Sequence, residues 1–196
     1  QPHDKYASLA DVVKNIETRL KARVGVAVHE PAGDMLWLYR SDERFPMCST
    51  FKTLACAALL YRIDKGEDSL DRLVPISLQH IASYSPVTEL HVEGSMSLFE
   101  LCAATMKTSD NTAANLILDA IGGPASLTAF IRMSGDLTTR LDRRETDLNE
   151  GTPGDFRDTT TPSAMARTVE RLVLGQILSP KSRQQAPSLM QALLWL

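Results

Sequence analysis

The first pattern along the chain is that of an amphipathic helix over residues 8–22. Its apolar residues recur at the spacing that places them on one helix face: Leu9, Val12, Val13, Ile16 and Leu20. An apolar run over residues 24–28 then predicts a buried strand, and a second run covers residues 35–39. Residues 31–34 supply turn chemistry between the two runs, so this part of the chain is predicted to form a β-hairpin.

From residue 49 onward the pattern becomes helical. Residues 53–63 are apolar almost all round, which is typical of a helix enclosed within a domain. Further helices are predicted over residues 98–106, 111–121, 124–133 and 162–174. Residues 140–161, by contrast, are rich in Asp, Thr, Gly and Pro and lack periodicity. Irregular segments of that length are uncommon within a domain and are usually functional, so this loop is a candidate part of a site.

The composition narrows the range of partners and cofactors. The formal net charge of the 196 residues is -3, whereas a nucleic-acid-binding face is usually basic. No apolar run approaches the ~20 residues of a transmembrane helix, so neither nucleic acid nor a membrane is an expected partner. The three cysteines and four histidines show no metal-ligand spacing, so neither a metal nor another cofactor is expected.

Ser49 and Lys52 stand at the start of the predicted buried helix. A serine at a helix N-terminus lies beside free backbone N–H groups and the positive end of the helix dipole, which stabilise an alkoxide and an oxyanion. A lysine three residues later lies one turn further on the same face, and burial lowers the pKa of its amine towards that of a usable base. The pair therefore suits nucleophilic catalysis, and an ordinary helix cap is the alternative interpretation of Ser49.

A second element, the tripeptide Ser109, Asp110 and Asn111, lies between two predicted helices, where short polar side chains can face a cleft. The same residues can cap the helix that follows, and the two interpretations are compatible.

The third element is Glu145, inside the long irregular loop. Arg143 and Asp158 could close that loop as an ion pair. Asn149, four residues beyond Glu145, could help to hold a water molecule.

The order and separation of these three elements resemble those of class A serine β-lactamases, which combine Ser-x-x-Lys, Ser-Asp-Asn and a loop glutamate. The resemblance runs from about residue 24 to residue 185 and includes long stretches at residues 108–118 and 155–162. Much of the helical sequence is similar to carbenicillin-hydrolysing members of the family.

The resemblance implies an α+β fold in which a helical domain stands beside an α/β sheet domain. Residues 1–47 would be the N-terminal part of the sheet domain, of which this chain holds the helix and the hairpin. Residues 48–185 would be the helical domain with its active-site loop at residues 140–158, and residues 186–196 would be an atypical C-terminal segment.

The resemblance also implies a role for each catalytic residue in a serine hydrolase that acts on cyclic amides. Ser49 would attack the β-lactam carbonyl, while Lys52 and Ser109 pass protons and Ser109 protonates the departing lactam nitrogen. Glu145 would activate a water molecule, held with Asn149, that hydrolyses the acyl-enzyme. Whether Lys52 or Glu145 activates Ser49 stays open.

Substrate binding and location follow from the same resemblance. Asn111 would bind the substrate's side-chain amide, and Tyr84 matches an aromatic residue at the edge of the family's site. The expected partners are β-lactam antibiotics of the penicillin type, with antibiotic resistance as the result. Because the N-terminus carries no signal-peptide apolar region, the sequence matches a mature periplasmic or secreted form.

Two other interpretations stay open. A penicillin-binding DD-peptidase shares the serine, the lysine and the Ser-x-Asn but lacks a loop base, so Glu145 favours the β-lactamase. A catalytically incomplete β-lactam-binding fragment is suggested because the resemblance stops after Gln185 and residues 186–196 carry no charged side chain. On that reasoning the chain alone is not expected to hydrolyse nitrocefin at a normal rate. It would be a monomer if complete, or complemented by or swapped with another chain if truncated.

Two covalent features are expected from the resemblance. Cys56 and Cys102 are expected to form a disulfide, because their helices pack side by side in the family. Such a disulfide would also fit export to an oxidising compartment. Cys48 is expected not to pair with either of them. Some carbapenem-hydrolysing members of the family also have a cysteine just before the nucleophile, whereas the helical sequence resembles carbenicillin-hydrolysing members, so the substrate spectrum stays open. The peptide bond between Glu145 and Thr146 is expected to be cis, as it is in family members with proline after the glutamate.

Overall fold

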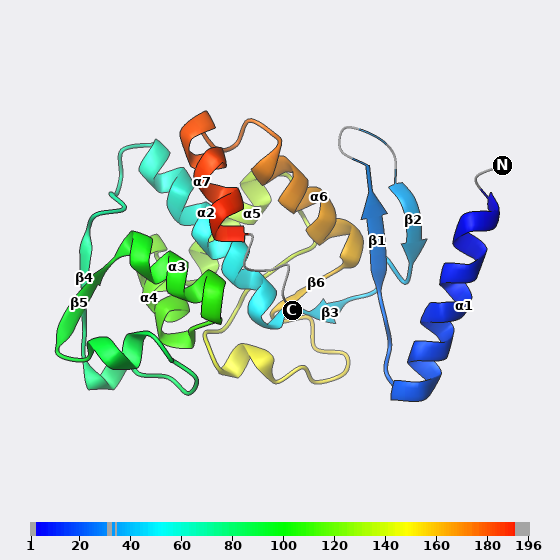
Figure 1. The fold of residues 1–196 in the computed structure, drawn as a ribbon, viewed down its shortest axis with the longest axis horizontal. Coiled ribbons are helices and arrows are strands. Elements are labelled where there is room, and N and C mark those ends of the chain that lie inside the picture. Colours follow the sequence, from blue (N-terminus) through cyan, green and yellow to red (C-terminus); the bar gives the residue numbers. More distant parts are fainter. Residues whose placement is uncertain (1–2, 31–32, 34, 191–196) are drawn as a thin grey trace.

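The computed structural model describes residues 3–30, 33 and 35–190. The helices and the first hairpin follow the predicted order (Figure 1), with the bounds α1 (His3–Leu20), β1 (Val26–His29), β2 (Met35–Tyr39), α2 (Phe51–Asp64), α3 (Leu98–Thr108), α4 (Asn111–Ile121), α5 (Pro124–Met133), α6 (Pro162–Val173) and α7 (Pro180–Met190). The shorter elements of the described chain are β3 (Phe45–Pro46), η1 (Cys48–Thr50), β4 (Leu73–Ile76), η2 (Leu78–His80), η3 (Thr88–His91), β5 (Gly94–Ser97), η4 (Asp147–Asn149) and β6 (Thr159–Thr160).

The helical body, residues 48–190, is built around α2. Residues 51–60 of this helix are all buried, as its almost uniformly apolar sequence predicts. Helices α3, α4, α5 and α7 pack against it, and Figure 1 shows α2 running through the middle of the body. This enclosure places the one charged residue of the stretch, Lys52, in apolar surroundings.

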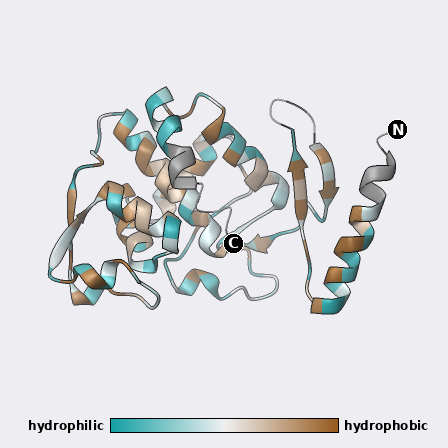
Figure 2. Cartoon of the chain, in the orientation of Figure 1, coloured by the Kyte–Doolittle hydropathy of each residue, from teal (hydrophilic) through white to brown (hydrophobic). Residues whose placement is uncertain are grey.

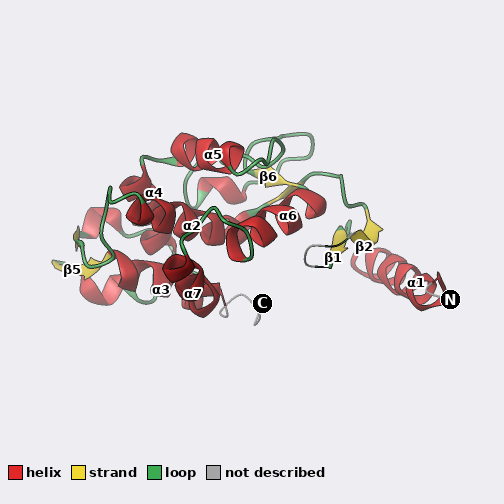
Figure 3. Cartoon of the chain, turned by 90° about the horizontal axis from the view of Figure 1, so that it is seen from above, coloured by secondary structure: helices red, strands yellow, loops and turns green. Residues whose placement is uncertain are grey.

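The α1–hairpin unit, residues 3–40, stands beside the body, with α1 at one end of the molecule (Figure 3). Strand β1 pairs with β2 in antiparallel register from Val26 opposite Tyr39, with an irregularity between Val28 and His29. The prediction of a buried strand over residues 24–28 was wrong in two respects. The strand begins at Val26, and Val28 is 39% exposed. Apolar residues colour both strands and much of α1 (Figure 2), yet few of them are enclosed.

Two short antiparallel ladders, which the sequence pattern did not predict, join segments far apart in the chain. Strand β4 pairs with β5, and β3 pairs with β6. The second ladder brings the end of the long loop beside the turn that holds Ser49, and the Met47 backbone N–H donates to the Asp158 carbonyl at 2.9 Å. The loop and the start of α2 are therefore fixed to each other.

Specific end residues set the bounds of α4 and α5. The Asp110 carboxylate accepts from the Ala113 backbone N–H at 2.8 Å and caps α4. Gly122 ends α4 with a φ of 95°, a left-handed conformation that glycine adopts without strain, and Pro124 opens α5. Both helices match the predicted bounds. The predicted segment 186–196 lies partly in α7, which runs to Met190, and partly outside the described residues.

Cys56 and Cys102 are free thiols, so the predicted disulfide between them is wrong. The two helices do pack together, and the two thiols are close enough to interact. The Cys56 contact and burial together raise the pKa of the Cys102 thiol well above its usual value. Both side chains are buried in the core, where a free cysteine packs as a small apolar residue.

None of the described helices is by itself long and apolar enough to cross a bilayer. Helices α4 and α5 pass the same test only as a pair bent by 69°.

Candidate active site

Ser49 lies in the turn η1, which leads directly into α2. Cys48 before it has a φ of 45°, in the left-handed region that residues with side chains seldom adopt and that is concentrated at functional sites. The helix-cap interpretation of Ser49 was wrong. Thr50 is the N-cap of α2 and no side chain caps the helix there, whereas the Ser49 hydroxyl contacts Lys52 and Ser109.

Five oxygen atoms surround the Lys52 Nζ atom. They are Asn111 Oδ1 at 2.7 Å, the Ser109 carbonyl at 2.8 Å, Ser109 Oγ at 3.0 Å, Ser49 Oγ at 3.1 Å and Glu145 Oε1 at 3.1 Å. Burial lowers the pKa of Lys52, and the negative charge of Glu145 opposes that shift. The amine is therefore easier to deprotonate than an exposed lysine, as the sequence predicted.

The directions of these contacts suit transfer of a proton from Ser49 to Lys52. The carbonyl oxygens of Ser109 and Asn111 can only accept, so they take two N–H bonds of the amine in either protonation state. The third direction of a neutral amine is its lone pair, which is left to accept from a hydroxyl, whereas the charged amine has a further N–H for the Glu145 carboxylate. Since the Ser109 hydroxyl donates to Ser49 Oγ at 2.9 Å, the hydrogen of Ser49 itself is free to point at Nζ.

The Ser109, Asp110 and Asn111 tripeptide faces two ways. Ser109 ends α3 with a φ of 58°, and this left-handed turn directs its hydroxyl and carbonyl at Lys52. Asp110 is fully buried and, besides capping α4, accepts from the Thr88 backbone N–H at 2.9 Å and from its hydroxyl at 2.8 Å. The capping and the site-forming interpretations therefore both hold.

Glu145 completes the cluster from the long loop. Its side chain is 1% exposed, Oε1 lies 3.1 Å from Lys52 Nζ, and Oε2 accepts from Asn149 Nδ2 at 2.7 Å. The Glu145–Thr146 peptide bond is cis, as predicted without a proline. Both carboxylate oxygens are thus oriented, one towards the lysine and one by the asparagine.

Asn115 also positions Glu145, and the sequence analysis missed it. Its Oδ1 accepts from the Glu145 backbone N–H and its Nδ2 donates to the Glu145 carbonyl, both at 3.0 Å. The available signal was its position on α4, four residues after Asn111 and therefore on the same helix face.

An ion pair closes the loop that carries Glu145, as predicted. Arg143 Nε lies 2.6 Å from Asp158 Oδ2, and Arg143 also pairs with Glu150. Asp158 is fully buried and accepts backbone N–H groups from Asp142 and Arg143 at 2.7 and 2.9 Å. The carboxylate therefore joins the two ends of the loop.

Tyr84 stands at the edge of this cluster and is 66% exposed. Asn111 holds its segment, since the Asn111 side chain donates to the Ser83 carbonyl at 2.8 Å and its backbone N–H donates to the Tyr84 carbonyl at 3.1 Å. Within the described ranges, no group of three or more His, Cys, Asp and Glu side chains is arranged to hold a metal.

Comparison with known proteins gives one family. The model of the β-lactamase enzyme family matches residues 8–193. A class A β-lactamase of the last common ancestor of Gram-negative bacteria is 53% identical, with a TM-score of 0.92, over 94% of this chain and 71% of that one. A further ancestral class A β-lactamase is 54% identical, with a TM-score of 0.90, over the same shares.

A natural β-lactamase is similar to this chain in sequence and in structure. A β-lactamase from Xanthomonas campestris pv. campestris is 46% identical, with a TM-score of 0.91, over 93% of this chain and 68% of its own. The α+β fold predicted from the sequence is confirmed by these matches. The chain therefore belongs to the class A β-lactamases, a family of serine hydrolases that act on β-lactams.

Proposed function

We propose that this chain opens the β-lactam ring of penicillin-type antibiotics through an acyl-enzyme on Ser49, and that it thereby confers resistance to them. The observation that supports this best is the position of Lys52 Nζ, 3.1 Å from both Ser49 Oγ and Glu145 Oε1. A nucleophile, a buried amine and a carboxylate in one contact chain can move a proton away from the serine as it attacks.

The first half-reaction forms the ester. Ser49 Oγ attacks the β-lactam carbonyl carbon, and its proton passes to Lys52 or through it to Glu145. The tetrahedral intermediate collapses as the C–N bond breaks, and the lactam nitrogen takes a proton from Ser109, which Lys52 replaces with the proton that left Ser49. Ser109 is suited to this relay because its hydroxyl lies 3.0 Å from Lys52 Nζ and 2.9 Å from Ser49 Oγ.

The second half-reaction releases the product. Glu145 removes a proton from a water molecule that attacks the ester carbonyl, and Ser49 leaves with a proton returned through Lys52. Asn149 fixes the carboxylate for this step, and Asn115 fixes the backbone on both sides of it. Asn111 and Tyr84 are the proposed binding residues, and the proposed location is the periplasm or the secreted fraction.

A β-lactam-binding protein that is acylated without turnover is the second candidate, together with a DD-peptidase. The position of Glu145 against Lys52 favours the hydrolase, because a carboxylate at this point has no role in acylation alone if Lys52 is the base.

Nitrocefin hydrolysis and intact-protein mass spectrometry separate these candidates. Steady hydrolysis that is lost in Ser49→Ala and retained in the control Glu89→Gln supports the proposal, since Glu89 is exposed on η3. One burst with a stable adduct on Ser49 supports the binding protein, and the absence of both hydrolysis and an adduct contradicts both. The expectation of less than normal turnover stays a prediction that the same assay tests.

A further inference from the structure

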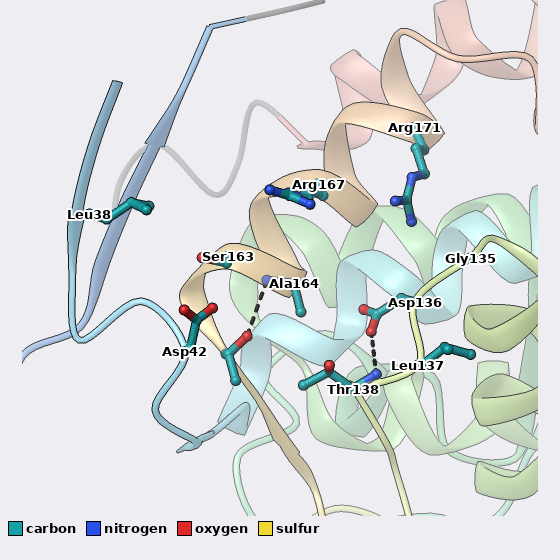
Figure 4. Close-up of a pocket in the computed structure, with 11 residues that line it drawn as sticks. Leu38, Asp42, Gly135, Asp136, Leu137, Thr138, Ser163, Ala164, Arg167 and Arg171 are labelled. Carbon is teal, nitrogen blue, oxygen red and sulfur yellow. Dashed lines mark hydrogen bonds between the residues drawn. The ribbon is translucent and has the colours of Figure 1, made fainter. Parts of the chain in front are cut away.

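A cavity of about 380 Å³ opens between the segment that follows β2, the loop after α5 and one face of α6 (Figure 4). Its lining includes Leu38, Asp42, Leu137, Ser163, Arg167 and Arg171. None of the proposed catalytic residues lines it. The cavity is therefore a separate place in the molecule at which a ligand could bind.

Two arginines from α6 form the positive side of this cavity. Ser163, Arg167 and Arg171 are four residues apart and so share a helix face. Arg171 donates to the Ser134 carbonyl at 3.1 Å and lies over Gly135, where an added Cβ would stand 3.2 Å from its Nη1 atom. Arg167 is exposed and has no ion pair or side-chain hydrogen bond within the described part of the chain.

Two carboxylates also line the cavity, but only one of them is available to a ligand. Asp136 is buried, and its carboxylate accepts from the Thr138 and Thr139 backbone N–H groups at 2.8 and 2.9 Å and from the Thr168 hydroxyl at 2.8 Å. Asp42 is exposed and has no side-chain partner among the residues that the structure describes. Figure 4 shows it on the segment after β2, apart from Arg167 on α6.

The groups left without a partner are thus one cation, Arg167, and one anion, Asp42, on different walls. A ligand with a single charge would satisfy one of them and face the other uncompensated, whereas a zwitterion pairs with both. The Arg167 guanidinium can bind a carboxylate through two parallel N–H bonds. Arg171, one turn further along α6, offers the N–H groups that its bond to Ser134 leaves free. Leu38 and Leu137, which are 47% and 79% exposed, add apolar surface at the rim.

We propose that this cavity binds a small zwitterion with an apolar side chain, a free amino acid or a dipeptide. Its carboxylate pairs with Arg167 and Arg171, its ammonium pairs with Asp42, and its side chain rests on Leu38 and Leu137. The volume is that of a pocket for a small molecule of this size.

Calorimetric titration of the full chain with the dipeptide alanyl-leucine tests this proposal. Its N-acetyl derivative and its C-terminal amide are the matched ligands, since each lacks one of the two charges. We expect saturable binding of the dipeptide and affinity reduced about tenfold for each capped form, the effect of losing one charge-assisted contact. Equal affinity for the three ligands, or no saturable binding, would overturn the proposal.

Two substitutions test whether the dipeptide binds in this cavity. Arg167→Gln and Asp42→Asn should each weaken dipeptide binding about tenfold, because each removes one ionic partner. Arg19→Gln and Asp71→Asn are the controls, since both change exposed charges away from the cavity and should bind as the unchanged chain does. Unaltered binding in both cavity variants would contradict the assignment even if the dipeptide binds.

Discussion

The helical body and the α1–hairpin unit are held together in different ways. The body has a continuous core of buried apolar side chains from every one of its longer helices up to α6. In the α1–hairpin unit, Val13 is the only described hydrophobic residue that is buried, and Val12 and Leu20 are 51% and 60% exposed. Apolar side chains are therefore enclosed in a packed core in one region and left half-exposed in the other.

Charged contacts join α1 to the hairpin where apolar packing is thin. Glu17 accepts from Arg40 Nε at 2.8 Å, from the Tyr39 hydroxyl at 2.9 Å and from the Val24 backbone N–H at 2.7 Å. The proposed catalytic side chains all belong to the body, where packing fixes them on several sides. A site that must hold five oxygens around one amine needs that rigidity.

The largest difference between the two regions is expected in core truncation. Leu127, on α5, is fully buried, so Leu127→Ala should lower the free energy of unfolding by about 3 kcal/mol through lost packing and the cavity left behind. Leu36, on β2, is 44% exposed, and Leu36→Ala should cost no more than about 0.5 kcal/mol. Urea denaturation measures both. Similar losses for the two variants would mean that the regions do not differ as described.

A smaller effect is expected from the ion pair that closes the active-site loop. Arg143→Ser leaves the buried Asp158 with its backbone donors but without its cation, and should cost about 2 kcal/mol, the range of a hydrogen bond between charged groups. We expect hydrogen exchange to rise in residues 140–158 and the substrate range to change. The control is Arg157→Gln, whose exposed pair with Asp155 lies on the loop surface. Unchanged exchange and unchanged kinetics would contradict the clamp.

The smallest effect concerns the acid stability of the α1–hairpin unit. The Arg40 and Val24 hydrogen bonds lower the pKa of Glu17 from 4.5 to about 2. Between these values the unfolded state binds more protons, so the stabilisation is complete above pH 4.5 and is lost as the pH falls towards 2. Protection of the α1 amides, that is, their exchange relative to the intrinsic rate at each pH, should fall between these pH values in the unchanged chain and in the control Asp11→Asn. Glu17→Gln should remove that dependence, and a dependence that persists would exclude Glu17 as its cause.

The sequence predicted the body better than the connections. The bounds of α4 and α5 were correct because Asp110, Gly122 and Pro124 act locally on the backbone. The β3–β6 ladder was missed because each of its strands has only two residues, which are too few to show the apolar and polar alternation of a strand. Phe45 and Pro46 pair with Thr160 and Thr159.

The same contrast applies to the site. Ser49, Lys52, Ser109 and Glu145 could be found because their residue types and spacing carry the chemistry. Asn115 was missed, because its spacing from Asn111 indicates the helix face but its role depends on where the loop backbone lies. The disulfide prediction was wrong, although the helices that carry Cys56 and Cys102 do pack together, because packing of two helices does not by itself bring two sulfur atoms to bonding distance and angle.

The most direct test of the account is the mass of Glu145→Gln after reaction with a penicillin. Opening of the ring leaves the lactam nitrogen attached to the acyl group, so Ser49 should gain the mass of the whole antibiotic. The account predicts that this adduct accumulates in the variant, since Ser49 and Lys52 are intact and the proposed base for the second half-reaction is gone. Absence of the adduct, or an adduct on a residue other than Ser49, would contradict it.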